Sequence, residues 1–253
     1  MSQRTKTPIK ATRTSLRIIE TLRQLEGAGV TELSDHLNIP NSTVHDHLKT
    51  LEQEELVVKR DNQYYIGMRL LDLGGYARNQ MSIFQIAKPE MRQLANETGE
   101  HVNLMIEEHG LGIFLHMVEG EQAVRLDTHA GKRVYLHTTA LGKAILAQIS
   151  EERLEEIIER RGLPEMTSRT VSSREELDEE LAGIRERGYS TDDEERISGM
   201  RCVAAPICPG DEVLGAVSVS GPKSKMQGDI FENELPAKVE RTANVIEVNT
   251  QYQ

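Results

Sequence analysis

The sequence predicts an α+β protein with two domains, and three observations support this fold class. A chain of 253 residues is longer than one typical core, so two domains are expected. Residues 30–53 have the pattern of two short helices joined by a tight turn. Beyond residue 82, strand and helix patterns alternate without βαβ regularity, which favours an antiparallel sheet with helices packed on it. We place the boundary close to Met81, so the predicted domains are residues 1–81 and 82–253.

The first of the two short helices is predicted from its apolar spacing and from the residues at its ends. Leu33 and Leu37 lie four apart and share one helical face, and Thr31 is a suitable N-cap. Asn38 can adopt the left-handed conformation that ends a helix, and Pro40 then closes the turn. A sharp turn is therefore expected directly before the second helix.

The second helix is predicted to be amphipathic, with Asn41 or Ser42 as its N-cap. Val44, Leu48 and Leu51 recur at i, i+4 and i+7, so they form a stripe that would be buried. The outward positions can all hydrogen-bond, and they are Ser42, Thr43, His45, Asp46 and Lys49. Such a pair fits the helix-turn-helix geometry that enters a DNA major groove, and it also fits a helical hairpin in an ordinary α domain.

The sequence on both sides of this pair favours DNA binding. An amphipathic helical pattern precedes it, with apolar residues at Leu16, Ile19, Leu22 and Leu25 and with Gly27 and Gly29 at its end. Two strand patterns follow it and flank a polar turn at residues 59–63, which predicts a β-hairpin. Three helices and a hairpin make a winged helix-turn-helix domain. The predicted DNA contacts are Thr31, Asn41, Ser42, Thr43, His45, Asp46, Lys49, Lys59 and Arg60.

The formal net charge of −11 is unevenly distributed along the chain. Basic and acidic residues balance within residues 1–66, so the remainder carries the whole acidic excess. The chain begins with basic residues before the first acid, which suits phosphate contact or a disordered solubilising tail. The excess of Arg over Lys in so acidic a chain resembles proteins of salt-loving microbes such as halophilic archaea, although acidic surfaces are also common elsewhere.

The protein is expected to be cytoplasmic. No apolar run is long enough to span a bilayer, and the polar, basic N-terminus lacks the pattern of a signal peptide. Cys202 and Cys208 are too few for a disulfide framework, so both are expected to be reduced.

A linker helix with an apolar face is predicted over residues 67–79. This face could cover the winged-helix core, transmit a change of shape or pair with a second subunit. Its apolar residues are Met68, Leu71, Leu73 and Tyr76. Another helix begins near Ser82, and Pro89 inside it predicts a kink or a fresh start at Lys88.

The second domain is predicted from alternating strand and helix patterns with turn residues between them. The expected strands cover residues 102–108, 112–120, 123–129, 202–207 and 213–220. The expected helices cover residues 139–148, 151–161, 173–187 and 231–248. The last two strands would form a hairpin around Pro209-Gly210-Asp211. These elements predict an antiparallel sheet with helices packed on it.

Several stretches of the chain together carry a family signature. They are YLHTTALGKAILA (Tyr135 to Ala147), RGYSTDDEERISGMRCVAAPI (Arg187 to Ile207), AVSVSGP (Ala216 to Pro222), NSTVHDHLKTLEQ and ETGEHVNL. In this order and spacing they resemble the IclR family of transcription regulators, over nearly the whole chain. The resemblance implies an N-terminal winged helix-turn-helix domain, a linker helix and a C-terminal GAF-like effector domain. It also implies homodimers or tetramers on a near-palindromic double-stranded DNA operator.

The resemblance further implies an effector pocket between the sheet and the helix that starts near Thr139. Its family positions here are Arg125, Leu126, Thr128, Ala140, Leu141, Gly142, Asp192, Met200, Cys202, Ser218 and Ser220. Residues 140–142 would present backbone N–H groups to a carboxylate, a role that suits a helix N-terminus. Alternatively, Ser218 and Ser220 only satisfy neighbouring backbone, and Cys202 is a small buried hydrophobe.

The expected effector is a small metabolite with a carboxylate, such as a sugar-derived or other short organic acid. The helix start would bind its anionic end. Asp192 would accept hydrogen bonds from hydroxyl groups, and Ser218 and Ser220 could donate or accept. No cofactor and no metal are expected.

Asp46 departs from the family pattern, because many relatives have a basic residue at this position. A carboxylate cannot bind phosphate, although it can accept a hydrogen bond from a cytosine amino group. Lys49 and the hairpin must then supply more of the phosphate contact, so the resemblance does not predict the operator sequence.

Two other functions fit parts of the sequence less well. An enzyme could use Cys202 with Asp192 and a His, since five of the eight His lie between His101 and His137. Yet no His lies in a recognisable catalytic motif, and the helix-turn-helix would be unexplained. A metal- or redox-sensing transcription regulator could use those His with the Cys pair, but they lack metal-ligand spacing.

Overall fold

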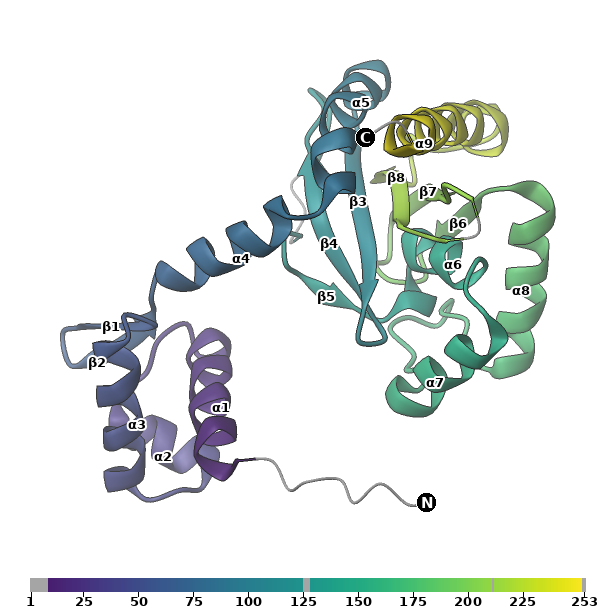
Figure 1. Ribbon diagram of the computed structural model, residues 1–253. Helices are drawn as coiled ribbons and strands as arrows, with labels where there is room; N and C mark the ends of the chain where they lie inside the picture. Colours follow the sequence, from purple (N-terminus) through teal and green to yellow (C-terminus); the bar gives the residue numbers. More distant parts are fainter. Residues whose placement is uncertain (1–8, 125–127, 211, 252–253) are drawn as a thin grey trace. The chain divides into compact units, whose positions relative to one another are not determined.

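The computed structural model describes residues 9–124, 128–210 and 212–251, and the chain divides into two compact units (Figure 1). The first unit is Met1–Ala77 and the second is Arg78–Gln253. The division falls inside helix α4, Arg69–Asn79. Among the described residues, no helix is long and apolar enough to cross a membrane.

The first unit is a winged helix-turn-helix domain, as predicted. Its elements are α1 (Lys10–Gln24), α2 (Val30–Leu37), α3 (Asn41–Gln53), β1 (Val57–Arg60) and β2 (Gln63–Ile66). Leu33, Val44 and Leu48 are fully buried in one core that all five elements share. Tyr64 of β2 exchanges two backbone hydrogen bonds with Ala28, of 2.9 and 3.1 Å. The hairpin is therefore tied to the connection between α1 and α2.

The helix N-caps differ from those predicted. Gly29 rather than Thr31 is the N-cap of α2. Pro40 rather than Asn41 or Ser42 is the N-cap of α3, and neither cap makes a side-chain hydrogen bond. Both helices begin earlier than expected, so the hydroxyl and amide side chains that were assigned to capping lie within the first turn instead.

Three of the residues with left-handed backbone in this domain lie at its predicted turns. Asn38 has φ 54° and ψ 53° and ends α2, as predicted. Asp61 and Asn62 have φ values of 48° and 66°, so the hairpin closes through two residues that tolerate this conformation. The turn is shorter than the predicted turn at residues 59–63, and Lys59 and Arg60 belong to β1.

Helix α4 has no buried residue. Its apolar side chains are largely exposed, with exposed fractions of 70% for Leu71 and 68% for Tyr76. This face therefore does not cover the winged-helix core. The next helix, α5 (Ser82–Thr98), runs through Pro89 without a break, so the predicted fresh start at Lys88 is wrong. Buried residues on both sides of the proline, from Ile83 to Ala95, hold this helix against the sheet.

The second unit is built on a six-stranded antiparallel sheet. Its strands are β3 (His101–Glu108), β4 (Leu111–Val118), β5 (Arg133–Val134), β6 (Ser190–Asp193), β7 (Met200–Ile207) and β8 (Gly215–Pro222). They lie in the order β5-β4-β3-β8-β7-β6, and every neighbouring pair is antiparallel. This confirms the α+β fold class with an antiparallel sheet.

Two details of the strand prediction are wrong. The described residues of the segment predicted as a strand at 123–129, including Val124 and Thr128, lie outside any strand, and residues 125–127 lie outside the described part of the chain. The strands β5 and β6 were not predicted. They are only two and four residues long, too short and too polar for a periodic pattern.

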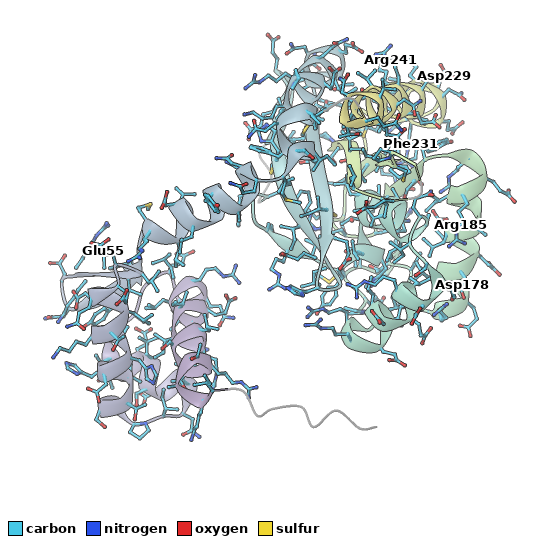
Figure 2. The ribbon with its side chains drawn as sticks, viewed as in Figure 1. Glu55, Asp178, Arg185, Asp229, Phe231 and Arg241 are labelled. Atoms are coloured by element: carbon cyan, nitrogen blue, oxygen red, sulfur yellow. The ribbon has the colours of Figure 1, made fainter. Side chains whose placement is uncertain are left out.

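Helices cover both faces of the sheet (Figure 1). Helices α5 and α9 (Leu235–Gln251, after the π-helical turn Ile230–Glu234) pack on one face. Arg241 of α9, labelled in Figure 2, pairs with Glu97 of α5 at 2.6 Å. The other face carries α6 (Ala140–Leu146), α7 (Glu151–Arg161) and α8 (Arg174–Arg187). The short 3-10 turn η1 (Leu136–Thr138) leads into α6.

Candidate ligand pocket and DNA-contacting surface

The register of the sheet gathers polar side chains on the face that carries α6. Ser220 pairs with Cys202, and Cys202 pairs with Asp192 across three strands. Two residues before Ser220 on β8, Ser218 lies opposite Asn103 of β3. Residues that pair directly across antiparallel strands point to the same face, so these five side chains form two short rows under α6.

Hydrogen bonds connect these rows. Asn103 Nδ2 donates to Ser220 Oγ at 3.1 Å and to Ser218 Oγ at 3.4 Å. Cys202 Sγ donates to Ser220 Oγ at 3.0 Å. The two serines therefore bond to side chains, not only to backbone. Asn103 was not predicted, although an amide between the apolar residues Val102 and Leu104 of a strand pattern is a signal that could have identified it.

A cavity lies between these rows and the start of α6, with an empty volume of about 480 Å³ that includes space open to solvent. Its described lining residues are Asn103, Phe114, Thr128, Thr139, Ala140, Leu141, Asp192, Arg196, Ile197, Met200, Cys202, Ser218 and Ser220. Most of the predicted effector positions thus meet at one cavity. Arg125 and Leu126 lie outside the described residues. The sequence did not identify Asn103, Phe114, Arg196 or Ile197, and it gave Thr139 only as the start of the helix beside the pocket.

Gly142 does not line the cavity, contrary to prediction. Thr139 is the N-cap of α6, and its Oγ1 accepts a hydrogen bond from the Gly142 N–H at 2.9 Å. A Cβ at Gly142 would lie 2.1 Å from the Leu136 carbonyl oxygen, so this glycine lets α6 begin directly against η1. Its amide is therefore committed to the cap and not available to a carboxylate.

Asp192 is buried at the cavity wall, with an exposed fraction of 4%. Its Oδ1 accepts a hydrogen bond from the Glu195 N–H at 2.7 Å. Burial, followed by the nearby Glu195 carboxylate, raises the pKa of Asp192 to about 7. Near neutral pH this carboxyl can thus either accept a hydrogen bond or, when protonated, donate one.

A buried ion pair lies beside the cavity. Lys143 of α6 is 1% exposed, and its Nζ donates to both carboxylate oxygens of Glu195 at 2.7 Å. Glu180 of α8 lies 3.6 Å from the same nitrogen. Burial raises the pKa of Glu195, while Lys143 opposes that rise. No role was predicted for Lys143, although a lysine within an otherwise apolar helix is a visible signal.

The cysteines and histidines do not support metal or redox sensing. Burial raises the pKa of the Cys202 thiol to about 12 and that of Cys208 to about 11. Both therefore stay protonated and weakly reactive at neutral pH. Within the described ranges, no group of three or more His, Cys, Asp or Glu side chains could hold a metal ion.

The predicted DNA-contacting residues lie on the surface of the winged-helix domain. The exposed positions are Thr31 on α2, Asn41, Ser42, His45, Asp46 and Lys49 on α3, and Lys59 and Arg60 on β1. Thr43 is half-buried. His45 Nδ1 lies 3.6 Å from Asp46 Oδ1. The Lys59 ammonium lies 5.4 Å from the ring centroid of Tyr64, its partner on the other strand of the hairpin.

Comparisons with known proteins agree along the chain. Residues 13–61 match the model of the IclR helix-turn-helix domain, and residues 76–248 match that of the bacterial transcriptional regulator IclR C-terminal domain. A probable HTH-type transcriptional regulator ArcR of Halobacterium salinarum is 35% identical over 239 residues, which are 92% of this chain and 91% of that protein. The transcriptional repressor IclR of Escherichia coli is 34% identical, over 85% and 80% of the two chains.

A solved structure has the same fold. It is an IclR homolog from Microbacterium hydrocarbonoxydans complexed with 4-hydroxybenzoate, with a TM-score of 0.80 and 21% identity over 96% of this chain and 100% of that one. The two family models, the two relatives and the shared fold all point to one class of protein, and that class consists of regulators rather than enzymes. The chain belongs to the IclR family of transcriptional regulators, which bind DNA through their helix-turn-helix domain.

Proposed function

We propose that this regulator binds a small organic acid in the cavity of its second domain and that this binding changes its affinity for DNA. One observation carries the proposal. Polar groups from β3, β6, β7 and β8, far apart in sequence, converge on one cavity next to the start of α6. A concave site with a few convergent polar groups is the usual form of a small-molecule site.

The chemistry of the wall favours a ligand with both an acid and a hydroxyl group. Ser218 and Ser220 can donate or accept, and Asn103 offers an amide. Asp192 would repel a second negative charge but can bond to a hydroxyl group. The bound 4-hydroxybenzoate of the Microbacterium hydrocarbonoxydans homolog has this combination of groups. Its identity with this chain is low, so we carry over only the class of ligand, a hydroxylated carboxylate.

Titration calorimetry on the wild type and on Asp192→Ala and Ser220→Ala tests the pocket. A panel of short hydroxy acids and sugar-derived acids serves as the set of probes. We expect an acid that binds the wild type to bind both variants more weakly, while DNA binding by the unliganded variants stays intact. Unchanged affinity for that acid in both variants would place the ligand site elsewhere.

The effector must also bind with different affinity to the DNA-binding state of the regulator and to the state that does not bind DNA. Equal affinity for both states would leave the equilibrium between them unchanged. Sequencing DNA that co-purifies with the protein, with and without the acid that binds, measures this effect. The same experiment identifies the operator and shows whether the acid releases or promotes DNA binding.

We propose that the protein binds a near-palindromic operator as a homodimer or tetramer, held together by the second domain. The exposed apolar side chains of α4, among them Leu71 and Tyr76, offer a further contact to a second copy. A two-fold protein needs half-sites separated by about one helical turn or a multiple of it. Footprinting that shows one unpaired half-site bound by a monomer would refute this arrangement.

A further inference from the structure

We propose that Arg196 binds the anionic group of the effector and thereby selects acids over their neutral analogues. This inference rests on the proposed function, since it assigns one residue to the recognition of the acid that the cavity would hold. The sequence signature did not include Arg196 in the pocket. Only the folded segment between β6 and β7 brings its side chain to the cavity.

Arg196 supplies the positive charge on the described wall of the cavity. The other described lining residues are neutral or, in Asp192, acidic. Burial raises the pKa of the Cys202 thiol, which lines the same cavity, and the charge of Arg196 partly lowers it. An anion in the cavity would therefore meet a cation on the side of Arg196 and a carboxyl at Asp192.

The Arg196 guanidinium is placed by an aromatic ring. Its central carbon lies 5.3 Å from the ring centroid of Phe114, and Phe114 of β4 lines the same cavity. An arginine over an aromatic face is attracted to the ring, and its flat, rigid fork matches the two oxygens of a carboxylate. The Phe114 ring thus holds the guanidinium at the cavity in a restricted orientation.

The backbone that carries Arg196 is fixed by the residues before it. Asp192 Oδ1 accepts a hydrogen bond from the Glu195 N–H at 2.7 Å. The Thr170 hydroxyl donates to the Glu195 carbonyl at 2.5 Å, and the Thr167 hydroxyl donates to the Glu194 carbonyl at 2.7 Å. The segment is therefore held from the sheet on one side and from the connection between α7 and α8 on the other.

The start of α6 is a weaker candidate for the same task. The Gly142 amide already bonds to the Thr139 hydroxyl, and α6 has only seven residues. A guanidinium carries a full charge and several N–H donors, so it can bind a carboxylate beside another partner, whereas α6 offers neutral amides. Asn103 and Ser220, which line the same cavity, offer partners for the hydroxyl group of an acid whose carboxylate is bound at Arg196.

Paired probes test this assignment. Glycolate, pyruvate and 4-hydroxybenzoate are each titrated beside their amides, glycolamide, pyruvamide and 4-hydroxybenzamide. For an acid that binds the wild type, Arg196→Gln should weaken binding by about ten- to a hundredfold, the range for a lost charged hydrogen bond. The affinity for the amide should change by less than about threefold, because the amide has no charge to lose. Arg196→Lys, which keeps the charge without the planar fork, should fall between wild type and Arg196→Gln.

Arg169→Gln is the matched control. It removes the same charge from a residue next to the same segment, where Arg169 pairs with Asp193 at 3.1 Å, but Arg169 does not line the cavity. It should bind the acid as the wild type does. Thermal unfolding and operator binding of all three variants show whether each is folded.

The outcomes separate the inference from the proposed function. If Arg196→Gln keeps the full preference for the acid, Arg196 is not the anion contact, although the cavity can still hold an acid. If Arg169→Gln loses as much affinity as Arg196→Gln, long-range charge and not contact is responsible, which also overturns the inference. If the wild type binds the amides but none of the acids, the proposed function and the inference both fail.

Discussion

Replacing Lys143 with Met would remove the positive charge of the buried pair beside the cavity while keeping most of the apolar length of the side chain. The Lys143 side chain is 1% exposed and that of Glu195 is 11% exposed, and the two groups meet at 2.7 Å. The substitution therefore leaves the Glu195 carboxylate buried without its cation. Breaking a buried pair in this way costs about 3–5 kcal/mol. Glu180, at 3.6 Å from the same nitrogen, would lose this contact but keep its ion pair with Arg187 at 2.8 Å.

Urea unfolding followed by circular dichroism at pH 8 measures this loss, with the second-domain transition analysed separately from that of the winged helix. Lys223→Met is the control, because Lys223 is 30% exposed and pairs with Asp193 at 3.1 Å and with Glu194, in a partly solvated cluster. Solvent screens the charges left in such a cluster, so this substitution should cost less than Lys143→Met. The double variant Lys143→Met with Glu195→Gln, which removes the stranded charge, should recover a large part of the loss.

The pH dependence offers an internal check. Without Lys143, the buried Glu195 carboxylate is neutralised only when it binds a proton. The loss of stability in Lys143→Met should therefore be smaller at pH 5 than at pH 8. Equal costs for Lys143→Met and Lys223→Met at pH 8, or no recovery in the double variant, would show that the buried pair does not stabilise this domain as argued.

Three further predictions concern other parts of the molecule. Lys59→Ala should weaken binding to all DNA sequences and lower the salt slope by about one unit, whereas Asp46→Ala should relax the preference at one base pair; equal weakening on every sequence in both variants would refute this division of roles. Burial raises the pKa of Asp192 to about 7 from 3.8, so the folded state favours the protonated carboxyl. The stability that the protonated Asp192 contributes is full below about pH 4 and is lost as the pH rises through 7. Asp192→Asn, which keeps an acceptor for the Glu195 N–H, should therefore gain stability over the wild type as the pH rises from 5 to 8, and a pH-independent difference in melting temperature would contradict it. Gly142→Ala should destabilise the second domain by about 1–3 kcal/mol in urea unfolding, because its Cβ would meet the Leu136 carbonyl at 2.1 Å; an unchanged midpoint would show that α6 can shift.

Local patterns in the sequence determined the winged helix. Val44, Leu48 and Leu51 recur at helical spacing and are all buried, and Asn38 adopts the left-handed turn that its side chain tolerates. These features depend on residues close together in the chain, so the order of elements could be predicted from them. The N-caps could not be predicted in this way. Neighbouring residues have a higher capping preference than Gly29 and Pro40, and the exact helix start is set only in the folded turn.

The family signature predicted the serine, aspartate and alanine residues of the pocket. The alternation of Ser218 and Ser220 predicted the polar face of β8. Asn103, Phe114 and Arg196 come from three other parts of the chain, and no spacing in the sequence relates them. Only the antiparallel register of β3, β4 and β8 and the segment after β6 bring them to the same cavity. The burial of Lys143 beside Glu195 was likewise decided by the tertiary structure, because the desolvation that makes this pair costly to break exists only once α6 packs on the sheet.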